Sequence, residues 1–234
     1  MIFVMIAIVV LIIVLAKLLE NFIEKKQGQK FGEQVGKIQR MTLIAMFSAI
    51  AFILMYFDFP LGFAPPFYKL DFSELPVLLG SFILGPVAGV LIEVLKILLK
   101  LAVKGTDTAL VGEFSNFVIG CSYILPASLI YGLMKDKKGM LLGLVSGTVL
   151  MSTAGCFLNA FVVVPKYAEI FGMPLSTIIA MGTKVNKNIT DMTTFIAFAV
   201  LPFNVFKCIV VSILTMMFYV PFLMIKKQVV KSKS

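Results

Sequence analysis

Long uninterrupted runs of apolar residues, separated by short polar segments rich in lysine, organise the whole chain. The main runs cover residues 41–57, 75–104, 112–134, 139–164 and 203–226. Runs of this kind are long enough for helices that cross a membrane, which need about 20 mainly apolar residues. They lack the alternating pattern of about 10 residues that is typical of outer-membrane barrel strands. Because a helix satisfies its own backbone groups in lipid, the pattern predicts an all-α integral membrane protein.

The run 75–104 is too long for a single crossing. At 1.5 Å per residue, a helix of this length would extend roughly 45 Å, against a hydrocarbon core of about 30 Å. Gly85 and Pro86 predict a break, because proline disfavours helical geometry in the residue before it and lacks an amide donor. The break turns residues 41–226 into a six-helix membrane domain. Its first half, 75–85, is short for a crossing and needs surrounding protein.

Residues 1–19 predict an extra N-terminal transmembrane helix ahead of this domain. No cationic residue precedes the run, although a signal peptide usually starts with positive charge. Basic residues follow it, so we interpret it as a helix that starts outside and leads into a cytoplasmic linker, 20–40. The alternatives are a peripheral or a cleaved segment. We expect no role for it in substrate chemistry.

Composition supports the membrane assignment. Hydrophobic residues make up 60% of the chain and charged residues 14%, with a mean hydropathy of +1.03, beyond what a soluble domain of this size needs. The three cysteines lie in apolar runs without CxxC spacing, and the chain contains no histidine. We therefore expect neither a disulfide framework nor a metal site.

The net charge of +9 indicates topology rather than nucleic-acid binding. The basic residues gather in three clusters at the ends of the apolar runs, within 17–40, 135–138 and 226–233. With six helices after residue 40, all three clusters fall on one side, which the positive-inside rule makes cytoplasmic. The basic tail, 227–234, and the C-terminus are then cytoplasmic.

The same topology leaves 58–73, 105–111 and 165–202 on the outside. The last of these segments is long for a connection and contains an apolar stretch, 195–201. Long ordered connections often serve as lids over a site. We therefore expect 165–202 to be a lid.

Three polar side chains beside this segment predict a binding pocket. Lys207 stands near the start of the last apolar run, where an ionisable group costs a few kcal/mol unless it faces protein or water. Asn204 lies on the same helical face, three residues before it. Asn159 is near the outer end of another run. The alternatives are a hydrogen bond to a neighbouring helix for Asn159 and an extension to the surface for Lys207.

Further charges lie in the run after the break. Glu93, Lys96, Lys100 and Lys104 follow one another at helical spacing on one stripe. One interpretation is a structural ion pair together with lysines that extend to the outer interface. The other is that part of the stripe lines the pocket. Glu93, Lys96 and Asn116 are therefore possible pocket residues.

Catalytic motifs are missing from the sequence. It contains no GxxxxGK[ST] phosphate loop, no HExxH and no GxSxG, and without histidine it lacks the commonest general base. The chain is not expected to be an enzyme, to hydrolyse ATP itself or to carry a cofactor of its own.

The segment 69–80, Lys-Leu-Asp-Phe-Ser-Glu-Leu-Pro-Val-Leu-Leu-Gly, resembles the loop before helix two in the S components of energy-coupling factor (ECF) transporters, and among them the riboflavin-specific (RibU) type. Asn159, Asn204 and Lys207 match the flavin-contacting amides and lysine of that family. Ala45 and Ala49 are similar to its AxxxA motif for docking on the coupling subunit. The resemblance covers roughly 40–226, and the N-terminal run departs from the six-helix plan.

The resemblance implies a substrate-capture subunit in a prokaryotic cell membrane. It would bind riboflavin from outside and deliver it inward with a transmembrane coupling protein (EcfT type) and two cytoplasmic ATPases. The flat ring and uracil-like edge of a flavin need apolar walls and polar groups on one edge. The external loop supplies the remaining substrate-binding candidates, which are Tyr68, Lys69, Leu70 and Phe72.

Other interpretations stay open at this stage. The main rival is an S component for a different vitamin. A stand-alone secondary transporter or channel would use the charged stripe as an ion pathway and need no ATPase. A membrane-embedded enzyme would use Glu93, Glu113 and Asp191 as acids or bases. Ala45 and Ala49 also fit an internal packing seam, since close helix approach needs small residues.

Overall fold

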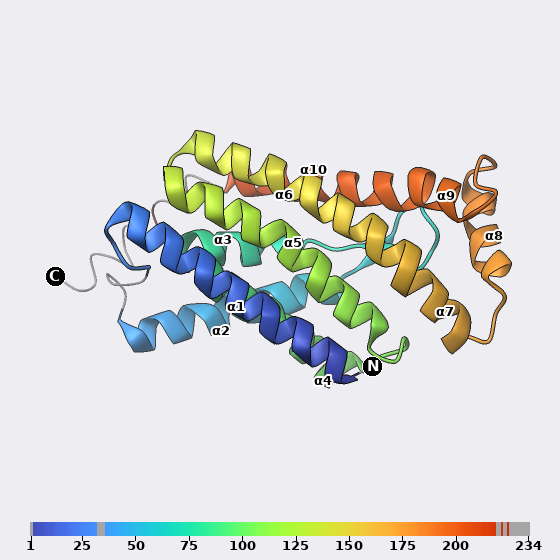
Figure 1. Cartoon of the computed structure of the whole chain (residues 1–234), viewed down its shortest axis with the longest axis horizontal. Helices are drawn as coiled ribbons and strands as arrows, with labels where there is room; N and C mark the ends of the chain where they lie inside the picture. Colours follow the sequence, from blue (N-terminus) through green and yellow to red (C-terminus); the bar gives the residue numbers. More distant parts are fainter. Residues whose placement is uncertain (1, 32–35, 219–220, 222–223, 225–234) are drawn as a thin grey trace.

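The structure is a computed structural model that describes residues 2–31, 36–218, 221 and 224 (Figure 1). Its helices are α1 (Ile2–Gln27), α2 (Lys37–Tyr56), α3 (Glu74–Leu84), α4 (Pro86–Lys104), α5 (Val111–Met134), α6 (Lys137–Leu158), α7 (Val164–Ile170), α8 (Leu175–Val185), α9 (Met192–Phe195) and α10 (Leu201–Met217). Two π-helical stretches, η1 (Asn159–Val163) and η2 (Ile196–Val200), join α6 to α7 and α9 to α10. Strands β1 (Phe59–Pro60) and β2 (Lys69–Leu70) pair antiparallel. The predicted all-α class is confirmed.

Five helices among the described residues are long and apolar enough to cross a membrane. They are α1, α2, α5, the continuous helix Lys137–Ile170 and the continuous helix Met192–Met217. Helix α4 has 19 residues but carries the charged stripe that begins at Glu93. The chain is thus a multi-pass membrane protein, in which α4 needs partners for its charges.

The break at Gly85 divides the long apolar run as predicted. Helix α3 ends at Leu84 and α4 begins at Pro86, and Gly85 between them has a φ of +97°, a conformation that glycine adopts at little cost. Nine of the eleven residues of α3 are buried. Its Phe82 packs on Tyr131 of α5, with 4.6 Å between ring centroids. The neighbouring helices thus enclose the short helix, as its length requires.

The predicted bounds of the connecting segment, 165–202, are wrong, as is the predicted start of the last helix at residue 203. The chain is helical through Pro165 and Pro202, and only 171–191, which includes α8, lies between the two long helices. Each proline follows a π-helical stretch by two residues. A π turn has a wider hydrogen-bond pattern and relieves the clash that proline makes with a preceding carbonyl. Asn204 and Lys207 therefore lie near the middle of the last helix.

Helix α1 packs along α4 and α5. Ala16, with Ile12 and Ile13 beside it, meets Val90 and Ile97 of α4 in one apolar cluster. The helix continues from the predicted end at residue 19 to Gln27, and α2 begins at Lys37. Most of the predicted linker 20–40 is therefore helical.

A buried carboxylate joins α1 to the break. Glu20 is 2% exposed, and its Oε2 accepts a hydrogen bond from the backbone N–H of Val87 at 3.1 Å, at the N-terminus of α4. Its Oε1 lies 3.7 Å from Nη2 of Arg40, which donates to the carbonyl oxygen of Leu84 at 3.2 Å. A negative charge at a helix N-terminus is favourable because of the helix dipole. Glu20 thus stabilises the junction of α1, α2, α3 and α4.

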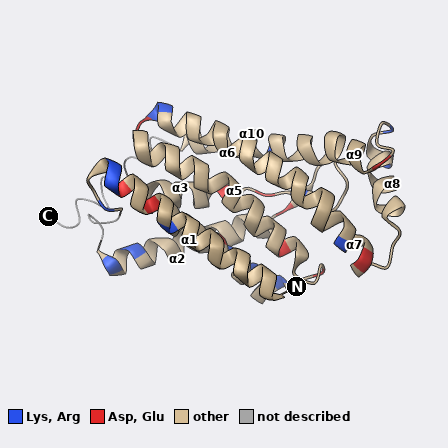
Figure 2. Ribbon diagram, viewed as in Figure 1, with Lys and Arg blue, Asp and Glu red and all other residues tan. Residues whose placement is uncertain are grey.

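Basic residues gather at this same end of the bundle. Figure 2 shows Lys and Arg where α1 ends, α2 begins and α5 joins α6. Two of the three basic clusters therefore lie together, as the topology requires. The third, within 226–233, and the predicted tail 227–234 lie outside the described residues.

Replacement of Glu20 tests this junction. Glu20→Ala leaves the Val87 N–H without its carboxylate, and we expect a loss of about 1–3 kcal/mol in the free energy of unfolding. Thermal unfolding of the purified protein in detergent measures it. The matched control is Lys25→Ala on the same helix, because Lys25 is exposed, and we expect its effect to stay within about 0.5 kcal/mol. Equal losses in the two variants would contradict the assignment.

Candidate functional site

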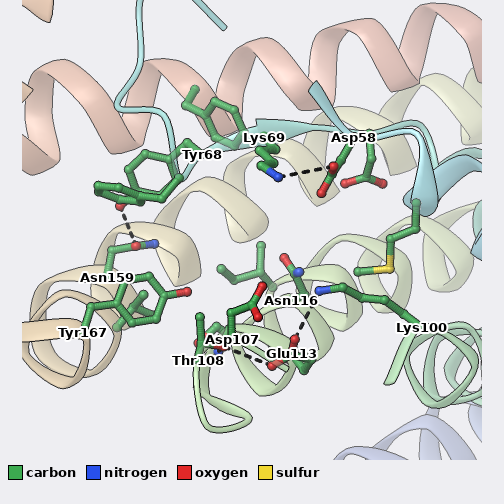
Figure 3. Close-up of a pocket in the computed structure, with 18 of the residues that line it drawn as sticks. Asp58, Tyr68, Lys69, Lys100, Asp107, Thr108, Glu113, Asn116, Asn159 and Tyr167 are labelled. Carbon is green, nitrogen blue, oxygen red and sulfur yellow. Dashed lines mark hydrogen bonds and ion pairs between the residues drawn. The ribbon is translucent and has the colours of Figure 1, made fainter. Parts of the chain in front are cut away.

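A cavity of about 450 Å³ opens near the β1–β2 hairpin, between α4, α5, α7, α8 and α10. Small-molecule sites commonly have about 300–1,000 Å³, so the space fits a ligand of vitamin size. Figure 3 shows Tyr68 and Asn159 on one side of it and Asn116 and Lys100 across from them. The polar side chains thus come from segments far apart in sequence.

Asn159 lies at the start of η1 and is 4% exposed. Its Oδ1 accepts a hydrogen bond from the hydroxyl of Tyr68 at 2.6 Å, and its Nδ2 donates to the carbonyl oxygen of Gly155 at 2.8 Å. Burial raises the pKa of Tyr68, so the phenol stays protonated as a donor. Both side chains line the cavity in fixed orientations.

Asn204 reaches the cavity from α10 and is 5% exposed. It packs so closely against Gly155 that a Cβ at position 155 would clash with the Asn204 Nδ2. Glycine is therefore required for this close approach of the helices. No hydrogen bond to the Asn204 amide is found within the part of the chain that the structure describes, so the amide is available to a ligand.

Lys207 pairs with a carboxylate that was not among the residues predicted from sequence. Its Nζ lies 2.8 Å from Oδ2 of Asp71, and the two residues are 7% and 6% exposed. The second oxygen of Asp71 accepts the backbone N–H of Ser73 at 2.9 Å. Burial alone would raise the pKa of Asp71, but the ammonium groups of Lys207 and Lys96 outweigh it and hold that pKa below its ordinary value. Asp71 is therefore ionised.

The structure brings Asn159, Asn204 and Lys207 to one cavity, together with Tyr68 and Lys69 from the external loop. Asn116, a possible pocket residue, lines it as well. Two candidates, Leu70 and Phe72, are not among the lining residues. Leu70 is buried away from the cavity lining, and Phe72 packs on Phe59. Aromatic walls come from Phe67, Tyr68, Tyr167, Phe171 and Phe203.

Glu93 and Lys96 form a buried ion cluster and do not line the cavity. The Lys96 Nζ lies 2.8 Å from Oε1 of Glu74 and 2.8 Å from Oε2 of Glu93, and it donates to Oγ of Ser73 at 2.9 Å. This geometry favours the structural interpretation of the two residues. Farther along the stripe, Lys100 and Lys104 do line the cavity.

The loop between α4 and α5 and the first turn of α5 supply pocket residues that were not predicted to line the pocket. Glu113 accepts hydrogen bonds from Thr106 at 2.9 Å and Thr108 at 3.1 Å, and it pairs with Lys100 at 3.1 Å. Asp107, Thr108 and Glu113 line the cavity. Thr106 and Thr108 could have indicated this cluster from the sequence, since hydroxyls shortly before a helix can donate to a carboxylate in its first turn.

The segment after α7 covers part of the cavity. Phe171, Met173, Ile178 and Met181 line it, and all four precede α9. The covering element is thus 171–191 with α8, shorter than the lid expected at 165–202.

Comparison with known proteins gives a family and two similar transporters. Residues 39–219 match the family described as the ECF transporter, substrate-specific component. The chain is 38% identical over 181 residues to the riboflavin transporter RibU of Staphylococcus aureus, an alignment that covers 77% of this chain and 88% of that protein. It is 30% identical over 185 residues to the riboflavin transporter FmnP of Bacillus subtilis, with 79% and 92% covered.

A solved S component of a bacterial ECF transporter has a similar fold. The TM-score is 0.60 at 34% sequence identity, over 79% of this chain and 95% of that chain. All of α1 precedes the residues that match the family.

Replacement of Lys96 tests the structural role of the ion cluster. Lys96→Met removes the cation that Glu74 and Glu93 share, and we expect a loss of about 3–5 kcal/mol in the free energy of unfolding. Thermal unfolding in detergent measures it. For comparison, Lys104→Met removes a side chain that is 36% exposed, with an expected loss below about 1 kcal/mol. A stable Lys96→Met variant would show that the cluster does not hold the bundle together.

Proposed function

The chain belongs to the family of substrate-specific components of ECF transporters, and from this we propose that it captures riboflavin at the outer face of a prokaryotic cell membrane. The observation that carries the proposal is the convergence of Asn159, Asn204 and Lys207 on one cavity with aromatic walls. The names of its relatives, both riboflavin transporters, support the choice of ligand.

The chemistry of the cavity suits a flavin. The isoalloxazine ring has a uracil-like edge, on which two carbonyl acceptors flank an N–H donor. The ammonium of Lys207 donates, and the free amide of Asn204 both donates and accepts. Phe67 and Phe203 supply apolar surface for the faces of the ring. Across the cavity, Asn116 and Thr108 offer partners for the ribityl hydroxyls.

Transport requires partners, and we propose a transmembrane coupling protein and two cytoplasmic ATPases. The sequence contains no phosphate-binding loop that would let the chain use ATP itself. The basic end of the bundle faces the cytoplasm in this scheme, together with the C-terminus. The cavity then opens toward the outside.

Helix α2 supplies the docking face for the coupling protein in this proposal. Ala45 and Ala49 are exposed, whereas Phe47 and Ser48 between them are buried. The exposure of the two alanines supports a docking face over an internal packing seam. Their small side chains allow another helix to approach closely.

An S component for a different vitamin is the remaining alternative. It shares the fold, the partners and the docking face, and differs only in what the cavity binds. A ligand titration therefore separates the two.

Riboflavin binding is the test of the proposed ligand. We expect riboflavin fluorescence to be quenched on titration with the purified protein. Lys207→Ala should weaken binding about 10–100-fold, as expected for loss of a hydrogen bond from a charged donor worth about 1.5–3 kcal/mol. The control is Lys166→Ala on α7, which removes an exposed lysine outside the cavity lining. Wild-type affinity in Lys207→Ala would show that Lys207 does not contact the ligand. Tight binding of another vitamin, without binding of riboflavin, would show that the ligand is that vitamin.

Bulky substitutions on α2 test the docking face. Ala45→Trp or Ala49→Trp should abolish riboflavin uptake by cells that contain the coupling protein and ATPases, because the helices can no longer approach. Binding by the purified protein should remain unchanged. Val149→Trp on α6, at a position 60% exposed, is the control and should preserve both activities. Loss of binding in the α2 variants would indicate a packing role instead.

A further inference from the structure

Asp71 is the sole partner found for the ammonium of Lys207 within the described residues. The two groups are 2.8 Å apart and both line the cavity. An ammonium has three donors, and Asp71 takes one of them. The other two N–H donors of Lys207 are left for a ligand that lies beside the free amide of Asn204. The direction in which Lys207 donates therefore depends on where Asp71 stands.

The position of Asp71 is fixed by two further contacts. The backbone N–H of Ser73 holds its second oxygen at 2.9 Å. The Ser73 hydroxyl in turn accepts from Lys96 on α4 at 2.9 Å, and Glu74 next to it pairs with the same lysine. Two lysines from α4 and α10 thus hold the segment 71–74, and the carboxylate of Asp71 has little freedom to turn.

The charge of Lys207 depends on Asp71 as well. Burial disfavours an ammonium unless an opposite charge lies nearby. The titratable groups that interact electrostatically with Lys207 are Asp71 before α3, Glu74 on α3, Glu93 and Lys96 on α4, and Cys208 on α10. Glu74 and Glu93 already share Lys96. Asp71 is therefore the carboxylate that balances Lys207.

We propose that Asp71 is a positioning residue for ligand capture, which orients the ammonium of Lys207 toward the cavity and keeps it charged. This inference rests on the proposed function, because it concerns how the same cavity holds riboflavin. Asp71 acts through Lys207, so its contribution disappears when Lys207 is absent.

The test is a double-mutant cycle followed as a function of pH. Riboflavin affinity is measured for the wild type, Asp71→Asn, Lys207→Met and the double variant, from neutral to alkaline pH. Asp71→Asn keeps the shape of the side chain and removes its charge. We expect it to bind about 10-fold more weakly at neutral pH, with a deficit that widens as pH rises because the unbalanced ammonium loses its proton. The wild-type curve is the reference and includes ionisation of the ligand itself.

The two Lys207→Met variants isolate the role of Asp71. Both should bind riboflavin with the same affinity, and the difference between them should not grow as pH rises, since neither has an ammonium that Asp71 could position. Should Asp71→Asn fail to fold, the double variant still decides, because it carries no unpaired ammonium at position 207. Glu169→Gln, which neutralises an exposed carboxylate on α7, is the control and should follow the wild type.

Two results would overturn the inference. One is an Asp71→Asn variant that matches the wild type at every pH. The other is a double variant that binds riboflavin more weakly than Lys207→Met does, by the same factor by which Asp71→Asn weakens binding in the wild-type background. Asp71 would then act independently of Lys207. Absence of riboflavin binding by the wild type would overturn the proposed function together with this inference, whereas normal wild-type binding with additive variants would overturn the inference alone.

Discussion

Two buried lysines and the carboxylates that balance them hold this bundle and its cavity in one arrangement. Lys96 and Lys207 are 1% and 7% exposed, and a buried ammonium without a counter-charge is strongly destabilising. Both lysines find partners in the segment 71–74, which leads from the external hairpin into α3. Four parts of the chain therefore meet there: the hairpin, α3, α4 and α10. The same contacts that stabilise the fold place Lys207 at the edge of the cavity.

The bounds of α2 to α5 and the break at Gly85 could be predicted from sequence to within a few residues, because hydrophobic runs and proline act locally. The convergence of Asn159, Asn204 and Lys207 followed from topology, once all three were assigned to one side of the membrane. Pro165 and Pro202 were misleading, since a π turn before each proline lets the helix continue, and the wrong lid boundaries came from there. Asp71 could not be paired from sequence, because its lysine lies 136 residues away and only the folded chain brings them together.

Helix α1 adds to the family fold without entering the site. The family match begins at residue 39, and no residue of α1 is among those that line the cavity that holds Asn159, Asn204 and Lys207. Its Glu20 is nevertheless buried against the N-terminus of α4, and Gln27 bonds to the carbonyl oxygen of Leu133 at the end of α5. The extension therefore supports the bundle at the end opposite the cavity.

Fold and relatives identify a substrate-specific component of an ECF transporter, for which we propose that aromatic walls and a polar edge hold a flavin and that other chains supply the energy. The visible absorption spectrum of the protein, purified in detergent from cells grown with riboflavin, tests this most directly. We expect a yellow protein with flavin in stoichiometric amount. A colourless protein that also fails to take up added riboflavin would contradict it, and the same fold would then have to serve another ligand.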